Sequence, residues 1–176
     1  MIDIETFGIK QTAPIVSIAA VQFNVANPEI QPQVFYTKVD IDSCLDIGCK
    51  IESKTIIWWM QQPKEALQEI TNHEGLPIKK ALLELSNFIK NFGEDICVWG
   101  NSARFDLGIL QNKFDYFKIE IPWNFKNELD LRTIVSFNPD IKKKTSFKGT
   151  RHNPVDDCIH QISYLNKTIE WIKNEF

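Results

Sequence analysis

The sequence predicts an α/β protein with a mixed sheet, three antiparallel strands followed by parallel strands, flanked by helices. Three apolar, β-branched segments follow one another near the N-terminus, as in a meander of hairpin-linked strands. The remaining chain alternates helical and short strand-like patterns, which is typical of helices packed on the faces of a sheet. Because 176 residues suit one hydrophobic core, we expect a single domain over residues 1–176.

The three antiparallel strands are expected at the start of the chain. The first contains residues 3–6 (DIET). The long apolar run from Pro14 to Asn24 indicates a buried second strand, and the partly alternating run from Val34 to Asp40 indicates its neighbour. Residues 41–52 follow neither period, so we expect them to be irregular.

Two helical stretches are expected next. A short helix should start at Ser53 or Thr55 and end or restart at Pro63. The clearest helix should begin at Pro77 and end at Gly93, because apolar residues recur between them at helical spacing.

The second half of the chain should supply the parallel strands. A short apolar strand is expected over residues 96–100, a helix over residues 101–114 and a weaker strand near residues 117–121. The final helix should start at Asn153 and Pro154, with Asn153 as the N-cap and Pro154 at the first helical position.

The composition narrows the class of protein. Hydrophobic residues make up 43% of the chain and charged residues 24%, as in ordinary globular proteins. No apolar run approaches the roughly 18 residues of a membrane span, and the acid at Asp3 argues against a signal peptide. We therefore expect a cytoplasmic protein with no membrane partner. The net charge of −3 argues against coating long nucleic acid by charge alone, but not against an enzyme that binds a few phosphates through metals.

The four cysteines lack the paired C-x2-C spacing of a zinc site. Cys97 and Cys158 stand in apolar patterns, so we expect both in the core. A disulfide between Cys44 and Cys49 is not expected in a reducing compartment.

Acidic residues of the first strand are the first candidate functional groups. Successive side chains of a strand point to opposite faces, so Asp3 and Glu5 share one face while Ile2 and Ile4 fill the other. Two carboxylates at this spacing can bind hard divalent cations, which prefer oxygen ligands and relieve the repulsion between the acids. The D-x-E pattern alone is common.

Further candidates follow along the chain. Asp106 comes just after a short strand, where it could instead be a helix cap or a solvated acid. His152 precedes Asp156 and Asp157 at the start of the last helix, where it could be a surface histidine with acids favourably placed at a helix N-terminus. Helical periodicity does not choose between Asp156 and Asp157, because both lie off the apolar stripe.

Three motifs in order carry a resemblance to a known family. D-x-E-T at residues 3–6, N-x3-F-D at residues 101–106 and H-x4-D at residues 152–157 resemble the DEDDh branch of the 3′–5′ exonuclease superfamily, which has an RNase H-like fold.

Two further segments resemble one group within that superfamily. Residues 55–62 (TIIWWMQQ) and 129–133 (LDLRT) are similar to elements of the RNase T-like group, which includes phage exodeoxyribonuclease A and bacterial 3′–5′ exoribonucleases. The chain departs from that group at Leu129, where a basic residue is common, and at Pro154, where alanine is usual.

The resemblance implies a function and a set of roles. The chain would be a metal-dependent 3′–5′ exonuclease that releases nucleoside monophosphates from single-stranded RNA or DNA with a free 3′ end. His152 would be the general base, and its reference pKa of about 6.5 suits that role. The resemblance selects Asp157 over Asp156. Two Mg²⁺ or Mn²⁺ ions would be bound by Asp3, Glu5, Asp106 and Asp157.

Several residues are candidate substrate contacts. Trp58 and Trp59 are adjacent on a helix and point roughly 100° apart, so we expect one to be buried and the other to stack on a base. The basic cluster formed by Lys142, Lys143, Lys144, Lys148 and Arg151, which we expect in a loop before His152, could steer phosphate. The full set of predicted substrate contacts is Thr6, Phe7, Trp58, Trp59, Asn101, Phe105, Lys148 and Arg151.

Two other functions remain open at this level. One is an endonuclease on the same fold, and the other is a catalytically inactive domain that only binds nucleic acid. The resemblance is compatible with a homodimer, which the residues alone do not decide.

Overall fold

The structure is a computed structural model that describes residues 1–28, 30–71, 74–93 and 95–175. Its centre is a five-stranded mixed sheet in the order β3-β2-β1-β4-β5. The first three strands pair antiparallel, whereas β4 runs parallel to β1 and β5 runs parallel to β4. This architecture confirms the predicted α/β class and is consistent with an RNase H-like fold. The strands are β1 (Ile2–Thr6), β2 (Ile15–Val21), β3 (Val34–Lys38), β4 (Val98–Gly100) and β5 (Glu128–Asp130).

Helices fill the connections and cover the sheet. A single 3₁₀ turn, Phe125–Asn127, precedes β5. The helices are α1 (Ile41–Leu45), α2 (Ser53–Met60), α3 (Lys64–Thr71), α4 (Ile78–Lys90), α5 (Ala103–Phe117), α6 (Leu131–Val135), α7 (Pro139–Lys144) and α8 (Pro154–Glu175).

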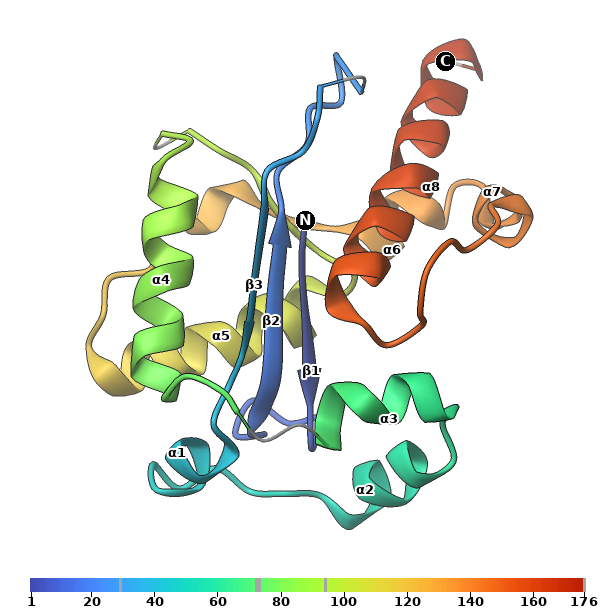
Figure 1. Cartoon of the computed structure of the whole chain (residues 1–176). Coiled ribbons are helices and arrows are strands. Elements are labelled where there is room, and N and C mark those ends of the chain that lie inside the picture. Colours follow the sequence, from blue (N-terminus) through green and yellow to red (C-terminus); the bar gives the residue numbers. More distant parts are fainter. Residues whose placement is uncertain (29, 72–73, 94, 176) are drawn as a thin grey trace.

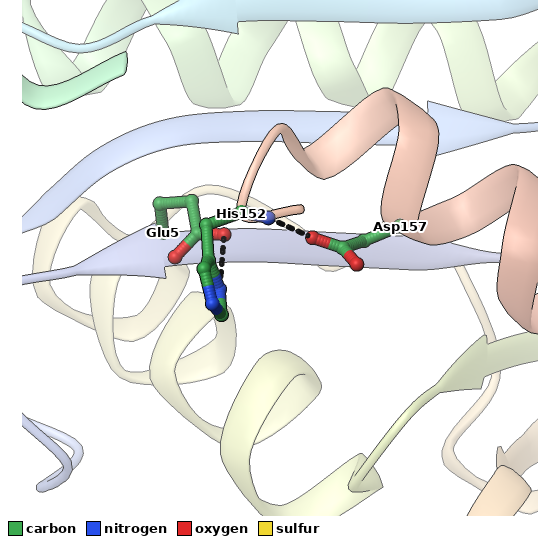
Figure 2. A group of neighbouring side chains, drawn as sticks. All are labelled: Glu5, His152 and Asp157. Atoms are coloured by element: carbon green, nitrogen blue, oxygen red, sulfur yellow. Dashed lines mark hydrogen bonds and ion pairs between the residues drawn. The ribbon is translucent and has the colours of Figure 1, made fainter. Parts of the chain in front are cut away.

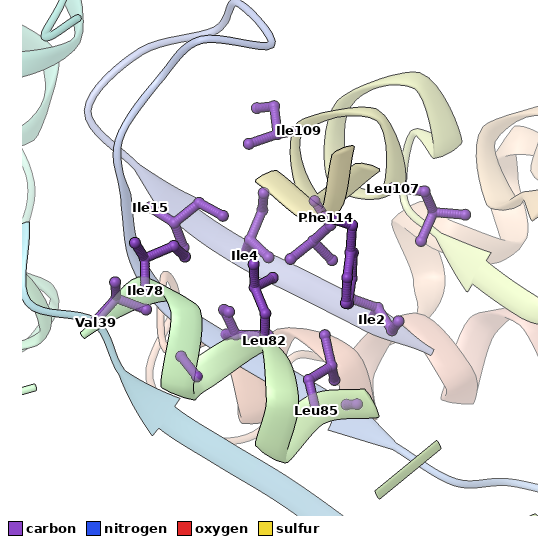
Figure 3. Packing of buried hydrophobic residues seen from close by; sticks show 14 of the residues in the cluster. Ile2, Ile4, Ile15, Val39, Ile78, Leu82, Leu85, Leu107, Ile109 and Phe114 are labelled. Carbon is purple, nitrogen blue, oxygen red and sulfur yellow. The ribbon is translucent and has the colours of Figure 1, made fainter. Parts of the chain in front are cut away.

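Two layers of helices enclose the sheet, as Figure 1 shows, with α4 and α5 on one face and α6 and α8 on the other. The main core lies between the sheet and α4 and α5, where Ile2 and Ile4 of β1 meet Leu82, Leu85 and Phe114 (Figure 3). A second buried cluster packs the other face against α6 and α8. Both faces of the central strand β1 are therefore covered by helices.

Most predicted helix boundaries agree with the structure. Pro63 separates α2 from α3, and Pro77 precedes α4. The Asn153 side chain accepts hydrogen bonds from the amides of Val155 and Asp156 at 3.1 and 3.2 Å, as expected of an N-cap.

Two expected secondary-structure assignments are wrong. No strand forms at residues 117–121, because α5 continues to Phe117 and Lys118 then adopts a left-handed conformation with φ 53°. The fifth strand is instead β5, three residues long and held by its pairing to β4. Residues 41–52 are not wholly irregular, because Asp40 caps the short helix α1 by accepting a hydrogen bond from the Asp42 amide.

The basic segment and one cysteine also differ from expectation. Pro139 starts α7, so Lys142, Lys143 and Lys144 lie on a short helix rather than in a loop. Cys158 is buried as expected, whereas Cys97 is exposed, because it lies outside the short strand β4. Among the described helices, none combines the length and the apolarity needed to cross a membrane.

The two adjacent leucines of α4 test the packing of the main core. Leu82 is fully buried and Leu83 is 43% exposed. We expect Leu82→Ala to lower the free energy of unfolding by about 2–5 kcal/mol, because it leaves a cavity in the core. Leu83→Ala, the matched control, should change it by no more than about 0.5 kcal/mol. Urea denaturation measures both values, and equal effects would contradict the assigned helix face.

Candidate active site

The first two acids of the site come from the central strand. Asp3 and Glu5 point away from Ile2 and Ile4, toward the face covered by α8, and each is only 8% exposed. The side-chain amide of Gln161, on α8, donates a hydrogen bond to Asp3 Oδ1 at 2.7 Å. Strand alternation therefore places two carboxylates beneath the last helix.

Asp106 reaches the same region from α5. Strand β4 lies beside β1, with Gly100 opposite Ile2, and α5 begins three residues after Gly100. The Ser102 amide donates to Asp106 Oδ2 at 3.1 Å, and the Asp106 side chain is 2% exposed. A parallel strand pair followed by a helix thus brings a third acid to the end of β4, beside β1.

The start of α8 supplies His152 and Asp157. The His152 amide donates a hydrogen bond to Asp157 Oδ2 at 2.7 Å (Figure 2). His152 has a left-handed backbone, with φ 64°, which is uncommon for a residue with a side chain. Asp156 instead accepts a hydrogen bond from the Thr150 amide at 2.7 Å, so it holds the preceding loop. Asp157 is therefore the acid that faces the other carboxylates.

These five side chains line one cavity of about 540 Å³. Ligand atoms of Glu5, His152 and Asp157 lie within 4.8 Å of one another, close enough to share a metal ion (Figure 2). His152 Nδ1 is 4.0 Å from Glu5 Oε1. This closest group contains the histidine, whereas the ligand set implied by the resemblance consists of the four acids. The five predicted side chains that line the cavity are Asp3, Glu5, Asp106, His152 and Asp157.

Burial raises the pKa values of all four acids, and repulsion from the other acids of the cavity adds to it at Asp3 and Glu5. Burial raises the pKa of Asp3 well above its usual value, and the charges of Asp106 and Asp157 raise it further. The pKa of Glu5 is also raised, first by burial and then by Asp3. Burial raises the pKa of Asp106 to about 7 and that of Asp157 to about 6. The cavity therefore holds more potential negative charge than its hydrogen bonds compensate.

His152 differs from the acids because its pKa is lowered. Burial is the largest cause, and the charge of Arg151 adds to it. The imidazole ring is held edge-on against Trp58 and Trp59, with ring centres 4.9 and 5.8 Å apart. A neutral imidazole can accept a proton near neutral pH.

The two tryptophans of α2 have separate surroundings. Trp59 is 1% exposed, and its indole Nε1 donates to the backbone oxygen of Thr6 at 3.0 Å. Trp58 is 41% exposed and borders the cavity. One ring thus fixes the end of β1 and the other faces solvent beside His152.

The predicted substrate contacts divide into two groups. Thr6, Trp58, Trp59, Asn101 and Phe105 line the cavity.

Phe7, Lys148 and Arg151 do not line it. Phe7 is buried in a cluster with Val16 and Trp59, so its side chain supports the site from beneath. The Arg151 guanidinium lies over the Phe147 ring at 4.9 Å, and Lys148 is exposed.

The structure adds three residues to the predicted site, of which Arg132 belongs to the LDLRT segment and the other two lie outside the motifs. Gln161 bonds Asp3, and it stands four residues after Asp157 on α8, a helical spacing that the sequence shows. Arg132 lines the cavity from α6. Glu69 of α3 accepts hydrogen bonds from the Tyr36 hydroxyl at 2.7 Å and from Asn153 at 3.4 Å, which links α3 to the His152 loop. Nothing local in the sequence indicates that link.

An α/β sheet with an acid-rich cavity at the ends of β1 and β4 is compatible with a nuclease, and the comparisons with known proteins give its family. The chain belongs to the family described as the 3′–5′ exoribonuclease Rv2179c-like domain, whose model matches residues 1–169. It is also similar to the exodeoxyribonuclease of Enterobacteria phage T4, with 24% identity over 203 aligned positions that cover 97% of this chain and 88% of the relative. Family membership supports exonuclease activity.

The raised pKa values predict how stability depends on pH when divalent cations are absent. A carboxyl group whose pKa is higher in the folded state stabilises the fold when protonated, and this contribution is lost as pH rises through the folded value. With Asp157 at about 6 and Asp106 at about 7, against a usual aspartate value of about 4 in the unfolded chain, the unfolding temperature in chelator should fall between about pH 4 and about pH 7.

Calorimetry across this pH range measures the effect. Asp106→Asn keeps an acceptor for the Ser102 amide but cannot ionise, so its unfolding temperature should vary less with pH. Asp115→Asn, at an exposed position, is the matched control and should behave as the unsubstituted protein. A pH dependence unchanged by Asp106→Asn would contradict the raised pKa.

Proposed function

We propose that this protein is a metal-dependent 3′–5′ exonuclease that releases nucleoside monophosphates from the 3′ end of single-stranded nucleic acid. One observation carries the proposal. Four carboxylates and one histidine, drawn from β1, α5 and the start of α8, border one cavity. Enzymatic hydrolysis of a phosphodiester bond needs both charge compensation and a general base, and this set of groups can supply both.

The donor set of the cavity fits hard divalent cations. Carboxylate oxygens are the ligands that Mg²⁺ and Mn²⁺ prefer. Burial raises the pKa values of the four acids, so a cation that lets them ionise gains binding energy from the relieved repulsion. We infer that Asp3, Glu5, Asp106 and Asp157 hold two such ions. Two such ions would supply charge stabilisation to the attacking and leaving oxygens of an in-line displacement.

His152 is the proposed general base. Its lowered pKa favours the neutral ring, which can take a proton from the attacking water. The edges of Trp58 and Trp59 restrict the ring, and the bond from its own amide to Asp157 fixes the backbone beneath it. His152 is therefore held beside the acids without needing to bind a metal itself.

The exposed face of Trp58 is the proposed stacking surface for the terminal base, a contact worth about 1–3 kcal/mol. Asn101 and Arg132 border the same cavity and can donate to phosphate or sugar oxygens. The family description names an exoribonuclease and the phage relative is an exodeoxyribonuclease, so RNA and DNA are both candidate substrates.

Metal removal is the first test. Chelator should abolish hydrolysis of 5′-labelled single-stranded RNA or DNA, and Mg²⁺ or Mn²⁺ should restore it, with products shortened one nucleotide at a time from the 3′ end. A circular single strand should stay intact, because an exonuclease needs a free end. Cutting of the circle would favour the endonuclease, and metal-independent binding without hydrolysis would favour the inactive domain.

Adjacent acids provide the matched control for this test. Asp157→Asn should abolish hydrolysis, because Asp157 borders the cavity, whereas Asp156→Asn keeps an acceptor for the Thr150 amide and should retain activity. Equal losses in the two variants would contradict the assigned ligand.

Substitution of the histidine separates its two candidate roles. We expect His152→Ala to lower kcat by about 10²–10⁴-fold, the usual contribution of a general base. The affinity for Mn²⁺, measured by calorimetry, should change little, because the four acids remain. His160→Ala, outside the cavity, is the control and should be active. A large loss of Mn²⁺ affinity in His152→Ala would make His152 a ligand instead.

A further inference from the structure

Two cysteines lie together at the end of α1, and neither lines the catalytic cavity. Gly48 takes the left-handed conformation, with φ 85°, and its amide donates to the Leu45 oxygen at 2.9 Å. The Cys49 amide donates to the Cys44 oxygen at 3.1 Å. These paired bonds form a Schellman motif. The two positions that Cys44 and Cys49 take in this motif frequently have side chains in contact.

The thiols make that contact in this chain. The Cys44 sulfur is fully buried, 3.7 Å from the backbone oxygen of Ile15, and it lies within hydrogen-bond reach of the Cys49 sulfur. Cys49 is half-buried against the main core, so a small molecule can reach it. Both cysteines are free thiols in the structure.

A buried ammonium group stands beside the pair. Lys113 of α5 is 1% exposed, and its Nζ donates to the Gln11 backbone oxygen at 3.0 Å and to Asn112 Oδ1 at 3.1 Å. It also lies near the Cys49 thiol, whose pKa it lowers. No carboxylate in the described part of the chain forms an ion pair with it.

A buried cation is costly unless an anion compensates it. The Cys49 sulfur is the group beside Lys113 that can become that anion. The hydrogen bond from Cys44, followed by the charge of Lys113, lowers the pKa of Cys49 to about 6, while that bond and burial raise the pKa of Cys44. At neutral pH the pair then consists of one thiolate and one thiol, which is the arrangement of a nucleophile and a resolving cysteine.

We propose that Cys44 and Cys49 form a modification site for hydroperoxides, with Cys49 as the nucleophile, Cys44 as the resolving thiol and Lys113 as the group that activates Cys49. The Cys49 thiolate attacks one oxygen of the peroxide, the O–O bond breaks, and an alcohol or water leaves with a proton from solvent. The product is a sulfenic acid. Cys44 then attacks the Cys49 sulfur, the S–O bond breaks, water leaves, and a disulfide remains.

Hydrogen peroxide is the probe for this site, and the readout does not depend on nuclease activity. The reduced full-length protein is treated at neutral pH, and the thiols are mapped by peptide mass spectrometry. We expect a peptide pair that joins Cys44 to Cys49 and is restored by dithiothreitol. Cys44→Ser should instead accumulate a sulfenic acid at Cys49 that dimedone traps, and Cys49→Ser should form neither product.

The exposed Cys97 is the internal control. At about pH 6, iodoacetamide should modify Cys49 roughly tenfold faster than Cys97, because Lys113 favours the thiolate of Cys49. In urea this preference should disappear, because unfolding separates Cys49 from Lys113. Lys113→Gln should move the pH midpoint of Cys49 alkylation upward, and Lys113→Arg should restore it in part.

Three results would each overturn the proposal. The first is modification of Cys97 at or above the rate of Cys49 in the folded protein. The second is the absence of a disulfide between Cys44 and Cys49 after peroxide treatment. The third is an alkylation midpoint of Cys49 in the unsubstituted protein that matches a free thiol, at about pH 8.5. The second and third measurements need no substitution at Lys113, so a misfolded variant cannot decide the outcome.

Discussion

Electrostatic repulsion between buried carboxylates is the constraint around which the rest of the structure is arranged. Asp3, Glu5 and Asp106 are each less than a tenth exposed, and Asp157 is close by. Such a group of acids opposes folding unless hydrogen bonds, protons or cations compensate it. Gln161 and backbone amides compensate only part of it. Family membership and this unbalanced charge both support the proposal of a site that works with divalent cations.

The central strand of the sheet holds two of these acids in place. Strand β1 uses one face for the main core, through Ile2 and Ile4, and the other face for Asp3 and Glu5. A displacement of the acids would therefore require movement of residues packed against α4 and α5. Trp59 supports the same strand, because its indole donates a hydrogen bond to the backbone oxygen of Thr6 at the end of β1.

The same principle of compensating a buried charge operates twice in this chain, with opposite signs. In the candidate active site, the buried carboxylates exceed the groups that compensate their charge, and divalent cations are the proposed compensation. Beside α1, the buried ammonium of Lys113 lacks a carboxylate and lies against a thiol that can ionise. We propose that both places are reactive for one physical reason, namely that a low-dielectric environment raises the energy of an uncompensated charge.

Local pattern was enough to predict much of this protein. Alternation on the first strand, the apolar runs of the next two and the caps of α4 and α8 all have causes within a few residues, so the mixed sheet and its main helices were predictable. Strand β5 was not, because three residues carry no periodicity and their extended form depends on pairing with β4. The exposure of Cys97 was missed because its apolar neighbours belong to the strand that it precedes.

The candidate site likewise contains residues that the sequence identified and contacts that only the structure shows. Spacing and resemblance identified five side chains, but neighbours in the chain could not show their directions. The resemblance selected Asp157 over Asp156, but only the structure shows that Asp156 holds the preceding loop, and only long-range packing decided that Trp59 rather than Trp58 is buried. The links of Gln161 to Asp3 and of Glu69 to the His152 loop join residues far apart in sequence. Contacts of that kind form when separate elements meet across the sheet, so no local motif encodes them.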